Sequence, residues 1–121
     1  MIYTTYFGKL NSKSMTAKIT PIAICAKAPD GWRRDQFKEL APDYAMYEAY
    51  KRTGDVDAFV AAYKERILSK LDPKQEANKI LLAAKVGTEP ALVCYEKTGS
   101  FCHRNIVADW LRRAGIEVQE L

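Results

Sequence analysis

Residues 94–104 hold the only histidine and two of the three cysteines of this chain. Their sequence, Cys-Tyr-Glu-Lys-Thr-Gly-Ser-Phe-Cys-His-Arg, brings two thiols, a carboxylate, an imidazole and a guanidinium into one short stretch. An apolar run precedes the stretch and an amphipathic helical pattern follows it, which predicts a strand, a loop and a helix. In an open parallel sheet, ligands bind beyond the carboxyl ends of the strands. The spacing therefore predicts a binding or catalytic site in this loop.

Three of these side chains are the candidate catalytic groups. Cys102 is expected in the first turn of the helix, where the helix dipole and the neighbouring His103 and Arg104 would stabilise a thiolate, so we predict a nucleophile or redox thiol. Glu96 directly follows the predicted strand and is expected to act as a general base or an orienting group. His103 is the only histidine in the chain, so any acid–base step by an imidazole has to use it.

The same loop is expected to bind an anionic ligand. A guanidinium offers a rigid fork of donors for carboxylate or phosphate, and a helix N-terminus offers unpaired N–H groups. The predicted ligand-binding residues are Cys94, Thr98, Gly99, Ser100 and Arg104. The expected ligand of this enzyme-like site is a nucleotide, a nucleic-acid component or another phosphorylated or carboxylated small molecule. The sequence identifies no cofactor.

Each of these residues also has a purely structural interpretation. Cys94 lies in an apolar run, as is typical of a small buried side chain. Glu96 and Arg104 can form an ion pair that closes the loop, while His103 can bond a backbone carbonyl. Cys94, Cys102 and His103 together can bind zinc, but three ligands without a Cys-x-x-Cys pair fall short of a closed four-ligand site. No metal is therefore expected.

Composition favours one small globular domain spanning residues 1–121. Apolar residues make up 48% and charged residues 28% of the chain, which are ordinary values for a soluble protein. No apolar run approaches the roughly 18 residues of a transmembrane helix, so no membrane partner is expected. The N-terminus resembles no secretory signal. Three cysteines without regular spacing favour a reducing compartment, and we predict a cytoplasmic protein.

The net charge of +4 allows an anionic partner such as nucleic acid, although the basic residues are dispersed as on an ordinary solvated surface. Trp32, followed by Arg33 and Arg34, can stack on a base and neutralise phosphates. Core packing is the more common role of such a tryptophan. A nucleic-acid-binding module without catalysis is therefore the alternative to an enzyme, and a structural loop clamp is a third interpretation. The oligomeric state does not follow from the sequence.

Strands and helices in alternation are expected to hold this loop. Apolar and β-branched runs predict strands at 2–7, 19–26, 91–95 and 116–121. Helical periodicity predicts helices at 42–52, 56–71, 73–86 and 102–114, the third one stopped by Gly87. Tyr44, Tyr47 and Tyr50 recur every three residues in the first helix and are expected in the core. The prediction is a small three-layer α/β fold, with a mostly parallel sheet of four or more strands and helices on both faces.

The motif and its surroundings resemble one known family. Leu-Val-Cys-Tyr-Glu-Lys at 92–97, followed by Phe-Cys-His-Arg at 101–104, is similar to the signature of the family called domain of unknown function 488. The opening strand, the second strand with Pro29 and Trp32, the Leu-Ala-Pro step at 40–42 and the helix at 63–71 are similar as well. Val93 departs from the pattern, since leucine is common there. The resemblance implies an α/β fold and a prokaryotic or phage origin, and it implies no particular reaction.

Overall fold

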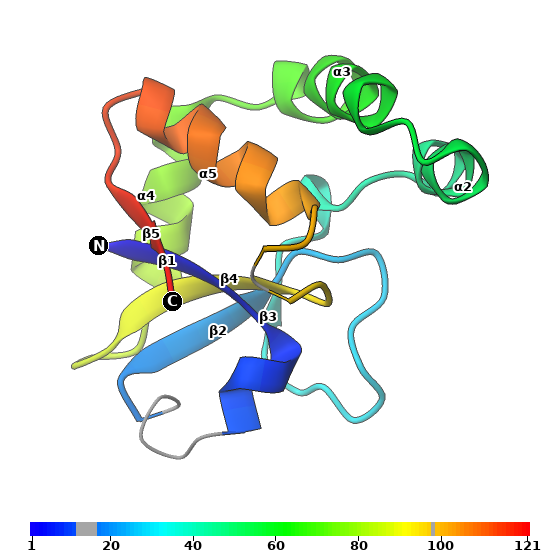
Figure 1. Ribbon diagram of the computed structural model, residues 1–121. Coiled ribbons are helices and arrows are strands. Elements are labelled where there is room, and N and C mark those ends of the chain that lie inside the picture. The colour runs from blue at the N-terminus through cyan, green and yellow to red at the C-terminus, as the bar shows by residue number, and fades with distance from the viewer. Residues whose placement is uncertain (12–16, 98) are drawn as a thin grey trace.

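The computed structural model describes residues 1–11, 17–97 and 99–121, and it contains a five-stranded parallel sheet (Figure 1). The strand order is β3-β2-β4-β1-β5. The strands are β1 (Ile2–Tyr6), β2 (Ile19–Ala23), β3 (Asp35–Gln36), β4 (Glu89–Cys94) and β5 (Val118–Glu120). All four strand pairings are parallel, so the α/β class and the parallel sheet predicted from the sequence are confirmed.

Helices fill the connections between these strands. The α-helices of the described residues are α2 (Tyr44–Thr53), α3 (Val56–Arg66), α4 (Pro73–Ala83) and α5 (His103–Arg113). Short 3-10 helices, η1 (Phe7–Asn11), η2 (Lys38–Leu40) and η3 (Leu68–Lys70), join them. No helix among the described residues is long and apolar enough to cross a bilayer. Along the chain, α2, α3 and α4 lie between β3 and β4, although β2 and β4 are neighbours in the sheet.

The main hydrophobic core lies between the sheet and the α-helices. Thr4 and Ile22 both pair with Leu92, so these side chains point to the same face of the sheet. On that face Leu92 and Ile22 join a buried cluster that includes Tyr63 of α3 and Leu111 of α5. Figure 1 shows α4 and α5 on one side of the strands and η1 on the other. One face thus carries the thick helical layer, and the opposite face carries a thinner cover.

Aspartates at the helix starts explain where the helices begin. The Asp43 carboxylate accepts a hydrogen bond from the Met46 amide, so α2 begins at Tyr44 and not at Pro42 as predicted. Asp72 caps α4 in the same way and Pro73 takes the first position, as expected. The predicted ends of α3 and α4 are wrong. The chain leaves α-helical geometry at Ile67, and α4 ends at Ala83 before it reaches Gly87.

The sequence did not predict β3, which is only two residues long. It pairs with β2 at Ile22 and Ala23, so that the backbone of Pro21 has no neighbour on the β3 side. Proline lacks a backbone donor and is tolerated where one edge of a strand is unpaired. Pro21 therefore lies inside β2 at a point where only the β4 side of the strand is paired.

Candidate functional site

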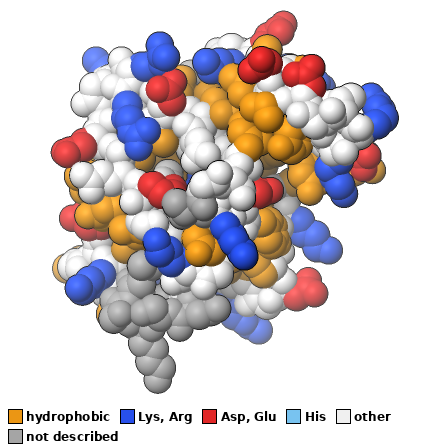
Figure 2. All heavy atoms as spheres, viewed as in Figure 1, with side chains coloured by type: hydrophobic (Ala, Val, Ile, Leu, Met, Phe, Trp, Pro, Cys, Tyr) orange, Lys and Arg blue, Asp and Glu red, His pale blue; other side chains and the backbone are white. Residues whose placement is uncertain are grey.

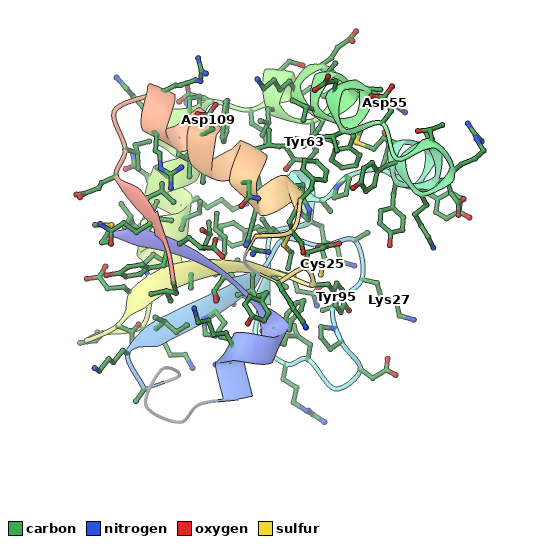
Figure 3. The ribbon with its side chains drawn as sticks, in the orientation of Figure 1. Cys25, Lys27, Asp55, Tyr63, Tyr95 and Asp109 are labelled. Carbon is green, nitrogen blue, oxygen red and sulfur yellow. A yellow bond between two sulfur atoms is a disulfide. The ribbon has the colours of Figure 1, made fainter. Side chains whose placement is uncertain are left out.

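The carboxyl ends of β2 and β4 and the N-terminus of α5 surround a cavity of about 240 Å³. Its lining comes from the segment after β2, the end of β4 with its loop, the start of α5, and an aromatic wall from α2 and α3. The lining residues are Cys25, Ala26, Lys27, Pro42, Tyr47, Tyr50, Phe59, Cys94, Tyr95, Glu96, Phe101, Cys102 and His103. Figure 3 shows Cys25, Lys27 and Tyr95 close together at this edge of the sheet, with Tyr63 above them. The cavity thus lies at the edge where parallel sheets bind ligands.

His103 is held in one orientation and one tautomer. Its Nε2 lies 2.7 Å from the backbone oxygen of Ile24. Because a carbonyl oxygen only accepts, Nε2 carries the proton and donates, which leaves Nδ1 as the acceptor of the neutral ring. Nδ1 lies 3.8 Å from the sulfur of Cys102. The Tyr63 ring packs against the imidazole at a centroid distance of 5.7 Å.

The electrostatics of His103 favour the neutral ring. Its side chain is buried, with only 7% of the residue exposed. Burial lowers the pKa of His103 to about 4, the Ile24 hydrogen bond opposes this shift, and the charge of Arg104 adds to it. The imidazole is therefore uncharged at neutral pH, and its Nδ1 can accept a proton or bind a metal ion.

Cys94 and Cys102 are joined by a disulfide, and their Cα atoms lie 7.5 Å apart. The burial predicted for Cys94 is confirmed, but the bond to Cys102 was not predicted from the sequence. Cys102 lies at the start of α5, as predicted, where it is the N-cap residue. Only 2% of the residue is exposed. The reactive thiol predicted at Cys102 therefore exists only after this bond is reduced.

Arg104 does not line the cavity but contacts Cys94 and Glu96, which do. The residue is 1% exposed, and its Nε and Nη2 donate to the carboxylate of Glu120 at 3.1 and 2.9 Å. Its Nη1 lies 3.1 Å from the Cys94 sulfur and 2.6 Å from the backbone oxygen of Glu96. The alternative of an ion pair between Glu96 and Arg104 is wrong, because Glu120 of β5 supplies the carboxylate. The role of Arg104 as a ligand clamp stays a prediction.

The loop between β4 and α5 is tied to the segment after β2. The Tyr95 hydroxyl donates to the backbone oxygen of Lys27 at 2.7 Å, and the Cys25 thiol donates to the same oxygen at 3.4 Å. Ser100 N donates to the Lys97 oxygen, and Gly99 has a φ of 93°, a left-handed conformation that glycine adopts without strain. Gly99 and Ser100 are exposed and do not line the cavity. The predicted ligand residue Thr98 lies outside the described residues.

The aromatic wall was missed by the sequence analysis. Tyr47 and Tyr50 line the cavity, whereas Tyr44 is 76% exposed, so the expectation of a buried tyrosine stripe is wrong. The rings of Tyr50 and Phe59 lie 5.3 and 5.4 Å from that of Phe101, measured between centroids. These residues come from three separate segments, so no local motif could have revealed the wall. The predicted packing role of Trp32 agrees with its edge-to-face contact with Phe7 at 5.1 Å.

A comparison with protein families fits this arrangement. The sequence model of the DUF488-N3a family, described as the active DUF488-N3 subclade, matches residues 5–115. The chain belongs to the DUF488 family. The matched range contains the cavity-lining segments of this DUF488 protein from Cys25 to His103, as well as Arg104. Neither the curated proteins nor the solved structures contain a significant match to it.

The cavity of this DUF488 protein brings together several kinds of chemical group. Glu96 lines it with the sulfurs of Cys94 and Cys102, and Lys27 adds one positive charge. Cys25 is a third, unpaired cysteine in the lining, and burial raises the pKa of its thiol. The Cys25 thiol is therefore protonated at neutral pH and is a poor nucleophile. The groups suited to chemistry are those that the Cys-x-Glu and Cys-His-Arg motifs supply.

Proposed function

We propose that this protein is an enzyme whose cavity binds a nucleotide or a related small anion that carries a flat ring. The observation that carries the proposal is the composition of the cavity. Cys102, His103 and Glu96 line it, Tyr47, Tyr50 and Phe101 supply aromatic surface, and Lys27 supplies a cation. Small-molecule sites are typically concave and mostly apolar, with a few convergent polar groups.

The aromatic wall supports a ligand with a ring system. Base–aromatic stacking contributes roughly 1–3 kcal/mol per base and tolerates every base, because each has a π-face. Lys27 supplies positive charge for a phosphate or carboxylate, and Cys102 and His103 at the start of α5, the positive end of the helix dipole, line the same cavity. The negative charge of Glu96 in the same cavity favours a singly phosphorylated ligand over a triphosphate.

Cys102, His103 and Glu96 are the residues assigned to the reaction, as predicted from the sequence. This reaction needs Cys102 as a free thiol. The cytoplasm keeps cysteine pairs reduced, so we assign the protein to that compartment. In the reduced protein His103 presents its unprotonated Nδ1 to the Cys102 sulfur, and Glu96 is a second proton acceptor in the cavity.

An amide NMR titration of the reduced protein with adenosine monophosphate tests this function. The expected result is a set of saturable shifts at Lys27, Tyr47, Tyr50 and Phe101, together with weaker binding by Lys27→Met. Lys85→Met is the matched control, since Lys85 lies in a different hollow, and it should bind like the wild type. Absence of shifts at millimolar nucleotide, or shifts confined to the surroundings of Lys85, would remove the proposal.

A nucleic-acid-binding role is the second candidate, and one observation favours it. Arg33, Arg34 and Lys85 line a hollow of about 300 Å³ beside the start of β2. On the face seen in Figure 2, however, Lys and Arg are interspersed with Asp and Glu and form no continuous basic surface. If this role holds, binding of single-stranded DNA should weaken steeply with salt and fall in the double variant R33M/R34M. No binding at low salt would exclude it.

A further inference from the structure

We propose that Cys94, Cys102 and His103 form a three-ligand zinc site in the reduced protein, with the fourth position of the metal open to the cavity. The inference deepens the proposed function by naming a cofactor for the same cavity. Its chemical role rests on that function, but metal binding itself does not. With the metal bound, Cys102 and His103 would be its ligands instead of a free thiol and a free base, and Glu96 would remain in the cavity as the proton acceptor. No metal was expected from the sequence, because three ligands do not close a structural site. An open catalytic site needs only three.

The three side chains converge although they come from two different elements. Cys94 ends β4, Cys102 caps α5 and His103 is the first residue of that helix. One ligand atom of each, two sulfurs and an imidazole nitrogen, lie within 4.8 Å of one another. All three residues are buried. Thiolate sulfur and imidazole nitrogen are the ligands that zinc prefers in proteins.

His103 is already oriented as a metal-binding histidine. Zinc-bound imidazoles usually donate their second N–H to a carboxylate, a backbone carbonyl or water, which fixes the ring and makes the ligand nitrogen more basic. Nε2 of His103 donates to the Ile24 oxygen at 2.7 Å, and Nδ1 faces the Cys102 sulfur. The ligand nitrogen is therefore unprotonated and aimed at the sulfur pair.

The disulfide has to open before metal can bind. A phosphine or small-molecule thiol supplies two electrons, which with two protons convert the S–S bond into two thiols while the reductant becomes its oxide or disulfide. Zinc then replaces the two thiol protons, which pass to solvent. Tetrahedral zinc with bonds of ~2.3 Å holds two sulfurs roughly 3.7 Å apart. The Cα atoms of Cys94 and Cys102 are separated by 7.5 Å, so the side chains can reach this spacing by rotation.

The surroundings balance the charge of such a site. Two thiolates neutralise Zn²⁺, and the Arg104 guanidinium, 3.1 Å from the Cys94 sulfur, stabilises the thiolate form. The same guanidinium holds the backbone of Glu96, whose side chain lines the cavity. Zinc bound there would supply Lewis-acid chemistry and an activated water, and Glu96 is a carboxylate in the same lining.

Cobalt(II) is the probe for the first test. The protein is reduced with a phosphine, freed of reductant under nitrogen and titrated with cobalt, while the sulfur-to-cobalt charge-transfer absorption is recorded. The expected result is one equivalent bound per chain, with absorption that vanishes when zinc is added. The oxidised form of the same preparation should show no such band. Equal behaviour of the oxidised and reduced forms, or no band in either, would overturn the inference.

Variants test which residues bind. Cys94→Ser, Cys102→Ser and His103→Phe should each weaken cobalt binding by more than the ~10–100-fold that loss of a second-shell partner costs. Cys25→Ser is the matched control, since Cys25 is a buried free cysteine in the same cavity, and it should keep the band. Loss of the band in Cys25→Ser with retention in Cys102→Ser would contradict the assignment. If a variant fails to fold by circular dichroism, the comparison of oxidised and reduced wild type decides.

The nucleotide titration separates this inference from the proposed function. Cobalt binding without nucleotide binding leaves the metal site standing and removes the ligand. Nucleotide binding by a reduced protein that takes up no cobalt would support the proposed function and overturn the metal site.

Discussion

The two ends of strands β2 and β4 differ in what they gather. At the carboxyl end, cysteines, an imidazole and a carboxylate surround an aromatic cavity. At the amino end, Thr20 and Thr88 share a hydroxyl–hydroxyl contact of 2.6 Å, and Thr20 also accepts from the Lys85 amide at 3.0 Å. Arg33 and Arg34 add positive charge to that hollow, and both residues are exposed to solvent. The same strands therefore carry reactive groups at one end and mutually bonded hydroxyls at the other.

This difference follows from the geometry of parallel strands. The segments after β2 and β4 both leave from the carboxyl edge, and the one after β4 runs into α5, so two loops and one helix N-terminus meet there. Hydroxyls at the amino end satisfy each other and neighbouring backbone groups, which stabilises the fold and leaves little free for a ligand. We expect variants at the two ends to affect different properties.

The largest expected effect is on stability, at the carboxyl end. Arg104→Met removes a buried guanidinium that bonds Glu120, the Cys94 sulfur and the Glu96 backbone. It should lower the free energy of unfolding by about 3 kcal/mol, as loss of one partner of a buried ion pair does. Urea unfolding midpoints measure this. Arg113→Met in the same helix is the control, because the Arg113–Asp109 pair is exposed, and it should cost below about 1 kcal/mol. Equal losses would show that Arg104 does not support the site.

The next largest effect is expected from Glu76, which lines neither the cavity after β4 nor the hollow beside the start of β2. Burial and the neighbouring Glu39 carboxylate raise the pKa of Glu76 to about 7. The native state thus keeps a proton that the unfolded chain loses near pH 4.5, so stability falls as pH rises from 5 to 8. After allowance for solvent screening, wild type should lose about 2 kcal/mol more over this range than Glu76→Gln. Denaturant melts at several pH values decide, and parallel curves for the two proteins would contradict the prediction.

The smallest effect is expected at the amino end. Thr20→Val keeps the side-chain volume and removes the hydroxyl that bonds Thr88 and the Lys85 amide. Because the Thr88 hydroxyl still donates to the Lys85 oxygen, only the bond from the Lys85 amide is lost without replacement. The free energy of unfolding should therefore fall by about 1 kcal/mol, the net contribution of one hydrogen bond, while nucleotide and cobalt binding stay unchanged. Thermal melts and both titrations measure the outcome. A loss of ligand binding in Thr20→Val would end the distinction between the two ends.

Local patterns predicted the elements and the motif well, because both depend on neighbours in sequence. The Cys-x-Glu and Cys-His-Arg spacing placed Glu96 and Cys102 at one cavity, and the periodicity at 56–66 predicted α3. The end of α3 could not be predicted, because its apolar pattern continues through Ile67 and Leu71 while the backbone turns.

Contacts between distant residues were beyond the sequence analysis. The carboxylate that pairs with Arg104 belongs to Glu120, sixteen positions away on an edge strand. Glu96 is much closer along the chain, which is why the sequence suggested it instead. Tyr47 reaches the cavity only because α2 is placed over the loop after β4, which no spacing within α2 encodes. The Cys94–Cys102 bond likewise depends on where the helix start meets the strand end.

Alkylation of the reduced, metal-free protein tests the central claim most directly. Iodoacetamide labelling at neutral pH is followed by mass spectrometry, with and without adenosine monophosphate. The account predicts that Cys102 is labelled faster than Cys25 and that the nucleotide slows labelling of Cys102. A Cys102 thiol that stays unlabelled, or that reacts at the same rate with and without the nucleotide, would contradict it.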